Sequence, residues 1–205
     1  MPSVSFHDKI GEGTYREVYQ VTPEVCVKRM KSYHKKDNLL GRIGYPTSLY
    51  TLAKFSIWDF NDFELKEYRK LLPNIPGELS GSFAKIIGVG RKDDESLLFQ
   101  ETVRDHDNGP SRPLMQTGPI FQECFWDRLM ELRDFFTGNN IHFFNVGPDN
   151  VIVKKTEQGI LVPVFTDYKR IGQRTYPYQL HLKLDCLARQ KVMRRFERLA
   201  ETYRA

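Results

Sequence analysis

The segment at 104–118 constrains the fold most, because it separates two halves of the chain that differ in character. It reads RDHDNGPSRPLMQTG, and its polar residues, two prolines and two glycines are typical of a linker or hinge. Short strand-like runs dominate before it, and helical patterns dominate after it. We therefore predict an α+β chain with a β-rich N-terminal lobe at 1–103, a hinge at 104–118 and a helical C-terminal lobe at 119–205.

Five short strand-like runs and one helix are predicted before the hinge. The helix covers 63–72 and ends where Pro73 and Asn74 follow. The expected strands are Val4–Ile10, Val18–Val21, Val25–Met30, Phe83–Val89 and Leu97–Glu101.

After the hinge, Pro119 is predicted to open an amphipathic helix that Gly138 closes. Its expected apolar side consists of Phe121, Cys124, Phe125, Leu129, Leu132, Phe135 and Phe136. Two strands follow, Val151–Lys154 and Leu161–Phe165, joined by a turn at 156–159. The last predicted element is an amphipathic helix over 183–205, with apolar positions at Leu184, Leu187, Val192, Phe196, Leu199 and Tyr203.

Composition indicates a globular chain, because 40% hydrophobic and 13% aromatic residues are too many for a disordered one. No apolar run approaches the roughly 18 residues of a membrane span, and the N-terminus lacks the pattern of a signal peptide. We therefore expect a cytoplasmic protein without an integral membrane segment. Cys26, Cys124 and Cys186 stand among apolar neighbours without zinc-site spacing, so all three are expected to be buried thiols.

The net charge of +5 is concentrated at the C-terminus. From Lys183 to Ala205, seven Lys or Arg residues stand against three acids. One interpretation is a solvated helix that closes the core. The other is a surface that contacts anionic lipid head groups or an acidic substrate, with nucleic acid the least favoured partner.

A turn containing Gly11 and Gly13, between two predicted strands, is the first candidate for binding chemistry. Glycines allow backbone N–H groups to approach phosphate oxygens closely. The pattern is neither a Walker loop nor a Rossmann fingerprint, because both of those precede a helix. Lys28 ends the next apolar strand and could reach phosphates under the turn if a carboxylate held it in place. Glu64 and Glu67 on the following helix are the available carboxylates.

Further motifs continue this order along nearly the whole chain. They are GEGTYREVY with Arg16 at the third glycine position, VCVK, Glu64-Leu65-Lys66 with Tyr68, Asp-Asn-Gly-Pro-Ser at 107–111, Ile141–Val153, Val162-Pro163-Val164 before Asp167, and the basic C-terminal helix. Together they resemble the protein-kinase-like superfamily, and most closely the PhoP-regulated bacterial kinase-like proteins of the YrbL family. The resemblance implies a two-lobed fold with an antiparallel-sheet N-lobe that carries one helix. It also implies a truncated helical C-lobe, since 38 residues follow Asp167.

The resemblance implies roles at the phosphates of ATP bound between the lobes. Gly11 and Gly13 would cover the phosphates. Lys28 would pair with the α- and β-phosphates, anchored by Glu64 or by the rival glutamate one turn further on. Arg16 would either add positive charge at the phosphates or fill the site and hinder ATP.

The resemblance also implies contacts for the adenine and for Mg²⁺. Backbone groups from Glu101 to Val103 would face the adenine edge. Asn150 and Asp167 would hold Mg²⁺, for which an amide oxygen and a carboxylate are suitable hard ligands. Tyr168 stands where regulated kinases have phenylalanine, so their Phe-dependent switch is not expected here.

Asn145 occupies the position where the family's loop usually carries its catalytic aspartate. Asparagine cannot accept the proton of an attacking hydroxyl, and loss of a positioned base slows a reaction about 10²- to 10⁴-fold. That factor corresponds to roughly 3 to 5 kcal/mol of transition-state stabilisation. Asn145 could still orient a nucleophile through its carbonyl oxygen, and Asp149 or His142 could act as a substitute base.

Two functions therefore remain open. The favoured one is an atypical phosphotransferase that uses MgATP on a small-molecule, lipid-linked or protein acceptor. The other is a pseudokinase that binds nucleotide and acts as a regulatory or interaction module. A pure interaction domain is disfavoured, because it would have no need for buried charges such as Lys28, Glu64 and Asp167.

Overall fold

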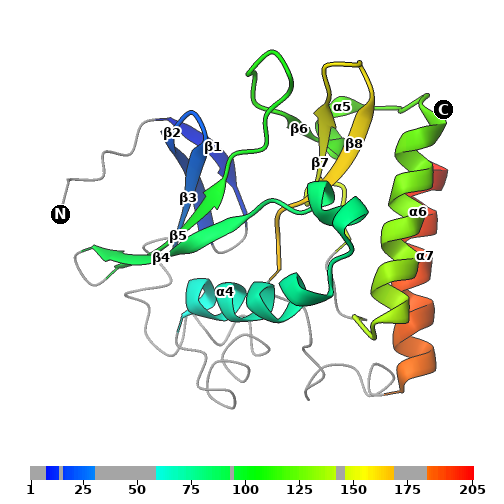
Figure 1. Cartoon of the computed structure of the whole chain (residues 1–205), viewed down its shortest axis with the longest axis horizontal. Helices are drawn as coiled ribbons and strands as arrows, with labels where there is room; N and C mark the ends of the chain where they lie inside the picture. Colours follow the sequence, from blue (N-terminus) through cyan, green and yellow to red (C-terminus); the bar gives the residue numbers. More distant parts are fainter. Residues whose placement is uncertain (1–7, 14–15, 31–58, 93–94, 142–145, 169–183) are drawn as a thin grey trace, which may run out of the picture. The chain divides into compact units, whose positions relative to one another are not determined.

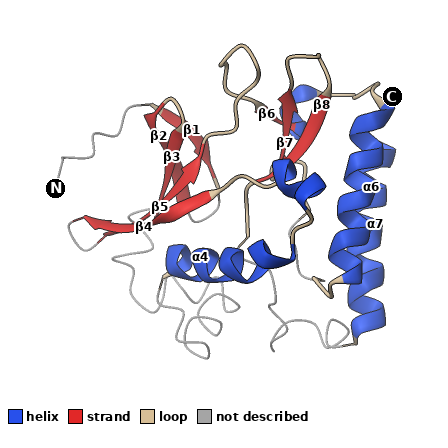
Figure 2. Cartoon of the chain, in the orientation of Figure 1, coloured by secondary structure: helices blue, strands red, loops and turns tan. Residues whose placement is uncertain are grey.

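The structure is a computed structural model that shows a mixed α+β protein with two antiparallel sheets (Figures 1 and 2). The predicted α+β class is confirmed, whereas its kinase-like form stays a prediction. The residues that the structure describes are 8–13, 16–30, 59–92, 95–141, 146–168 and 184–205.

The chain divides into two compact units, each formed by two stretches of sequence. The first unit consists of Met1–Lys66 and Lys85–Thr102, and the second of Glu67–Ala84 and Val103–Ala205. Helix α4 (Phe60–Leu71) therefore contributes its first half to one unit and its second half to the other. Two short 3₁₀ helices, Leu72–Asn74 and Gly77–Ser82, follow it.

The first unit contains a five-stranded antiparallel sheet in the order β1-β2-β3-β5-β4. The central strand β3 matches its predicted bounds and carries Val27, which is completely buried. Cys26, Val27 and Lys28 are consecutive buried residues, so both faces of the strand are covered there. The strands are β1 (Lys9–Glu12), β2 (Arg16–Thr22), β3 (Val25–Met30), β4 (Ile86–Lys92) and β5 (Glu95–Glu101).

Four of the five strands begin or end elsewhere than the sequence predicts. β2 is longer than predicted at both ends, and β5 begins two residues earlier, at Glu95. The first predicted strand continues through Gly11, which pairs with Val18 and so lies within the ladder instead of the turn. Residues 4–7 of that predicted strand lie outside the described residues. β4 begins three residues later than predicted, because Phe83 forms a parallel bridge with Phe165 and the Ala84 N–H donates to the Phe165 carbonyl at 3.0 Å.

The predicted hinge at 104–118 contains regular structure, and its role as a hinge or linker stays a prediction. β6 (Arg112–Pro113) joins β7 (Val151–Lys155) and β8 (Leu161–Phe165) in a three-stranded sheet, and α5 (Leu114–Thr117) follows β6. Several polar residues of the segment make hydrogen bonds within the fold. The Asp105 carboxylate accepts hydrogen bonds from the Ser111 hydroxyl at 2.6 Å and from the Lys155 N–H at 2.7 Å.

Helices α6 (Glu123–Gly138) and α7 (Asp185–Tyr203) lie side by side in the second unit (Figure 1). Aromatic side chains form the core beneath them. The ring of Phe136 lies 5.5 Å from that of Phe165 and 6.0 Å from that of Phe196. These rings connect α6, β8 and α7.

The predicted start of α6 at Pro119 is wrong, since the helix begins at Glu123. Ile120 cannot be helical, because it is held in a bridge to the C-terminus. Its N–H donates to the Tyr203 carbonyl at 2.7 Å, and its carbonyl accepts from the Ala205 N–H at 3.2 Å. As a result Phe121 precedes the helix and is 79% exposed, instead of joining the apolar side.

The predicted apolar face of α7 is partly wrong, because Leu184 and Leu187 are exposed. The core receives the small side chain of Ala188 instead, followed by Val192 and Phe196 as predicted. Arg194 and Arg198 are among the exposed basic residues, so contact with an anionic surface stays a prediction. None of the described helices is long and apolar enough to span a membrane.

The prediction of three buried thiols is correct only for Cys26, which lies on the central strand β3. Cys124 and Cys186 are exposed. Each is the second residue of its helix, α6 or α7, and lies on a side that the core does not cover.

Iodoacetamide at pH 8 should therefore alkylate Cys124 and Cys186 in the native protein and spare Cys26. Burial restricts reagent access to Cys26 and also raises the pKa of its thiol, so the nucleophilic thiolate is scarce. Peptide mass spectrometry would measure the three rates, and urea should make all three cysteines reactive. Equal alkylation of Cys26 in the native state would contradict the burial of β3.

Candidate functional site

A buried polar cluster joins three strands of the first unit to the first half of α4. The register of the sheet explains how the strands place their members. Val18, Lys28 and Leu98 lie opposite one another on β2, β3 and β5, so they share one face. Arg16 and Ser96 lie two residues before Val18 and Leu98, and therefore point to that same face.

Helix α4 supplies the other two members, Asn61 and Glu64. Their spacing of three residues places both on one side of the helix. Both side chains are completely buried, and Arg16, Lys28 and Ser96 are also buried. Charged and polar groups of this kind remain inside a fold only when they are paired.

Glu64 lies at the centre of the cluster and contacts two cations. Its Oε1 accepts a hydrogen bond from Lys28 Nζ at 2.8 Å, and its Oε2 accepts one from Arg16 Nη2. Both contacts are ion pairs between buried side chains. Two positive charges therefore offset the desolvation of the single carboxylate.

Asn61 fixes the guanidinium of Arg16 from the other side. Its Oδ1 accepts a hydrogen bond from Arg16 Nη1 at 2.9 Å. Its Nδ2 donates to the carbonyl and the hydroxyl of Ser96, each at 3.0 Å, and to the Lys28 carbonyl at 3.3 Å. These acceptors set the orientation of the amide, so Oδ1 must face the arginine.

The predicted contact of Lys28 with Glu64 is present, whereas the rival Glu67 pairs with Lys70 at 2.5 Å. Glu67 is also buried, but Lys70 is largely exposed. The role of Lys28 at a phosphate stays a prediction.

The two glycines predicted at the phosphates are not required by packing. A Cβ at Gly11 would lie 3.5 Å from the Val18 side chain, and one at Gly13 would lie 3.7 Å from the Arg16 carbonyl. Both are ordinary contacts. The Gly13 N–H donates to that carbonyl at 2.8 Å, which closes the turn between β1 and β2.

The backbone predicted to face adenine already makes several hydrogen bonds. The Glu101 N–H donates to the Lys85 carbonyl, and the Thr102 N–H donates to the Glu24 carbonyl, each at 2.8 Å. In the second unit, the Val103 carbonyl accepts from the Ser111 N–H at 3.1 Å. Any adenine contact here must therefore use other groups or a second lone pair of a carbonyl oxygen.

The two predicted Mg²⁺ ligands, Asn150 and Asp167, lie at the same end of the β7–β8 hairpin. Val151, the first residue of β7, pairs with Phe165, the last of β8. Asn150 immediately precedes that pair, and Asp167 follows it by two residues. Asn150 is held in a turn, where its N–H donates to the Gly147 carbonyl at 2.9 Å, and Asp167 is buried.

This pair of ligands suits a metal ion that arrives with phosphates. Among the described residues, no group of three or more His, Cys, Asp or Glu side chains could hold a metal ion. Mg²⁺ at nucleotide sites is held by one or two carboxylates together with phosphate oxygens and water. Asn150 and Asp167 therefore fit Mg²⁺ bound to a nucleotide.

Tyr168 fixes the chain directly after Asp167. Its hydroxyl lies 2.8 Å from the Ala84 carbonyl and 2.9 Å from the Phe165 carbonyl, and it donates its proton to this pair of acceptors. Its completely buried ring lies 5.0 Å from the ring of Tyr68.

The predicted base position, Asn145, and the substitute base His142 lie outside the described residues. The other substitute, Asp149, is exposed in the turn before β7. Its Oδ1 lies 2.5 Å from where a Cβ of residue 147 would be, so a side chain at Gly147 would require the exposed Asp149 carboxylate to shift.

Asn61 and Ser96 were not predicted as members of the site. Asn61 precedes Glu64 by three residues, and this spacing was the available signal. Ser96 becomes a member only through the β3–β5 register, which the sequence does not reveal.

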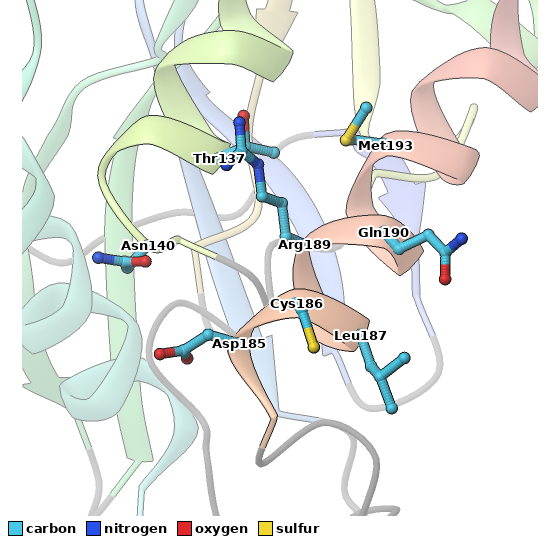
Figure 3. A pocket seen from close by; sticks show the side chains of 8 residues that line it. All are labelled: Thr137, Asn140, Asp185, Cys186, Leu187, Arg189, Gln190 and Met193. Atoms are coloured by element: carbon cyan, nitrogen blue, oxygen red, sulfur yellow. The ribbon is translucent and has the colours of Figure 1, made fainter.

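The second unit also has an open pocket at the end of α6 and the start of α7 (Figure 3). None of the predicted site residues lines it. The lining side chains are Thr137, Asn140, Asp185, Cys186, Leu187, Arg189, Gln190 and Met193.

Comparison of the chain with protein-family models and with curated proteins gives no match. The functional interpretation therefore depends on the residues themselves. In chemical terms, the cluster holds a lysine ammonium at a fixed position next to a glycine-containing turn. The hairpin end provides an amide and a carboxylate.

Glu64→Gln should lower the free energy of unfolding by about 3 kcal/mol or more, because two buried cations lose their shared carboxylate. Glu67→Gln is the matched control, with an expected loss of about 1 kcal/mol or less, since its partner Lys70 is largely exposed. Urea unfolding followed by circular dichroism would measure both. Equal losses of unfolding free energy in the two variants would contradict the predicted role of Glu64 as the shared partner of two buried cations.

Proposed function

We propose that the chain binds ATP with Mg²⁺, using Lys28 at the phosphates. The observation that carries this proposal is the 2.8 Å ion pair between Lys28 and the completely buried Glu64. Lys28 lies on β3, which pairs with β2, and β2 is the strand that follows the glycine-containing turn. A lysine fixed in this way provides positive charge at a defined place, as phosphoryl chemistry requires.

The energetics of the pair support a functional role. Burial of an ion pair gives little or no net stability compared with apolar side chains of similar size. The fold would therefore gain as much from a methionine and a leucine as from Lys28 and Glu64. A need to bind an anion accounts for the charges better than stability does.

Asn150 and Asp167 are the proposed metal ligands. When bound, Mg²⁺ would neutralise charge on the phosphate oxygens. The register of β7 and β8 keeps the two side chains at one end of the hairpin, and Tyr168 anchors the backbone beside Asp167.

We further propose that the protein is an atypical phosphotransferase whose acceptor is a small molecule, a lipid-linked molecule or a protein. Its residues would act mainly by position and charge, because the base position holds Asn145. The second candidate is a pseudokinase that binds nucleotide and acts as a regulatory module. The asparagine at position 145 is the observation that favours it, since its amide cannot take up a proton.

ATP with Mg²⁺ should raise the melting temperature of the wild-type protein. A concentration of 100 times Kd would add about 2.7 kcal/mol of stability. Lys28→Met and Asp167→Asn should reduce the shift, measured against the melting temperature of each variant alone. Gly13→Ala should also reduce it with little change in stability, since its Cβ would make only ordinary contacts.

Lys70→Met is the matched control, because Lys70 also pairs with a buried glutamate of α4 but lies outside the proposed site. It should keep the full shift. No shift in the wild-type protein, with or without Mg²⁺, would overturn the proposed binding of ATP.

Asn145→Asp should increase phosphoryl transfer by about 10²- to 10⁴-fold if the missing base limits the rate. Its affinity for ATP should stay close to that of the wild-type protein. Mass spectrometry of the protein after incubation with ATP, together with a measurement of ADP release, would record the transfer. If neither the wild-type protein nor Asn145→Asp transfers phosphate while both bind ATP, the pseudokinase is the correct function.

A further inference from the structure

Arg16 takes part in the cluster in a way that neither predicted role describes. The sequence predicts that it adds charge at the phosphates or obstructs ATP. In the structure its guanidinium is held at both ends by α4, with Nη1 on Asn61 and Nη2 on Glu64. The side chain is 7% exposed, close to the 8% of Lys28.

We infer that Arg16 is a positioning residue that holds the Glu64 carboxylate in place for Lys28 and fixes the glycine-containing turn to α4. The inference rests on the proposed binding of ATP and concerns how the site is kept ready for it. Arg16 needs no contact with the nucleotide for this role.

The two carboxylate oxygens of Glu64 contact different cations. Lys28 contacts Oε1, and Arg16 contacts Oε2. When the ammonium of Lys28 turns toward a phosphate, Oε1 loses part of its compensation. Arg16 still offsets the buried charge at Oε2, so the carboxylate keeps its position and its ionised form. Lys28 can then bind a phosphate with a smaller loss of electrostatic stabilisation at Glu64.

Arg16 also connects the glycine-containing turn to α4. The Arg16 carbonyl accepts a hydrogen bond from the Gly13 N–H at 2.8 Å, while the side chain of the same residue is bound to α4. One residue thus links the end of the turn to the helix that carries Glu64. Asn61 strengthens the link, because its amide is itself oriented by Ser96 and the Lys28 backbone. Glycine at position 16 would provide no such link.

A double-mutant cycle on ATP affinity tests the inference, with isothermal titration of MgATP as the measurement. The proteins are the wild type, Arg16→Met, Lys28→Met and the double variant. Arg16→Met should weaken binding about tenfold, which is the loss of about 1.4 kcal/mol. If Arg16 acts through Lys28, the double variant should bind no more weakly than Lys28→Met alone.

Two further variants separate positioning from simple loss of stability. Arg16→Lys keeps a cation for Glu64 but lacks the second arm for Asn61, so it should restore most of the affinity, to within about threefold of the wild type. Arg16→Gln, which removes the charge and keeps polar atoms for Asn61, replaces Arg16→Met in the cycle if the latter does not fold. Arg29→Met is the control, because Arg29 makes a partly exposed ion pair with Glu95 on the same sheet. It should bind ATP normally.

Equal ATP affinity of Arg16→Met and the wild type would overturn the inference and leave the proposed function intact. Losses that add in the double variant would also overturn it, because they would show that Arg16 acts independently of Lys28. Failure of the wild-type protein itself to bind ATP would overturn the proposed function, and the inference with it.

Discussion

The first unit depends on one buried negative charge, the carboxylate of Glu64. A carboxylate without water is tolerated only where cations and hydrogen-bond donors surround it. This requirement fixes the rotation of α4, since Asn61 and Glu64 must both face the sheet. It also fixes the register of β2 against β3, because a slip of one residue would move Arg16 or Lys28 to the other face.

In the second unit, the β7–β8 hairpin is held at both ends. At its turn, the Gln122 side chain donates to the Gly159 carbonyl at 2.9 Å and accepts from the Leu161 N–H at 2.8 Å. At its other end, Phe165 bonds to Ala84 and bridges to Phe83. Supports at both ends leave the hairpin little freedom, which would suit the metal site proposed beside its end.

Much of the fold was accessible from sequence, because Val25–Met30 and Leu161–Phe165 are apolar runs bounded by turn residues. Prediction failed where a distant partner decided the conformation, as at Ile120, which the C-terminus holds out of α6. The regular structure within 104–118 was missed for a related reason. Its polar residues bind one another and Lys155, and composition alone cannot distinguish this from a solvated linker.

Prediction of the candidate site was also limited by contacts between residues that are distant in the sequence. A contact of Lys28 with a glutamate of α4 was predictable, because a strand lysine followed by a helix with glutamates leaves few possible pairs. Glu64 and Glu67 could not be told apart without the helix rotation. The other members of the cluster around Glu64 can be identified only from the strand register. Ser96 and the pairing of Arg16 with Glu64 could therefore not be predicted from the sequence.

Tyr168 has a consequence for how this protein could be controlled. A rearrangement of the backbone at Asp167 would require that Tyr168 leave its buried place and give up its hydrogen bonds to Ala84 and Phe165. Exposure of the ring and loss of these bonds would cost on the order of 3 kcal/mol. That cost limits the alternative to about one molecule in a hundred at equilibrium. The backbone at Asp167 is therefore kept in one conformation nearly all the time, and regulation by its movement would need an effector that first displaces the tyrosine.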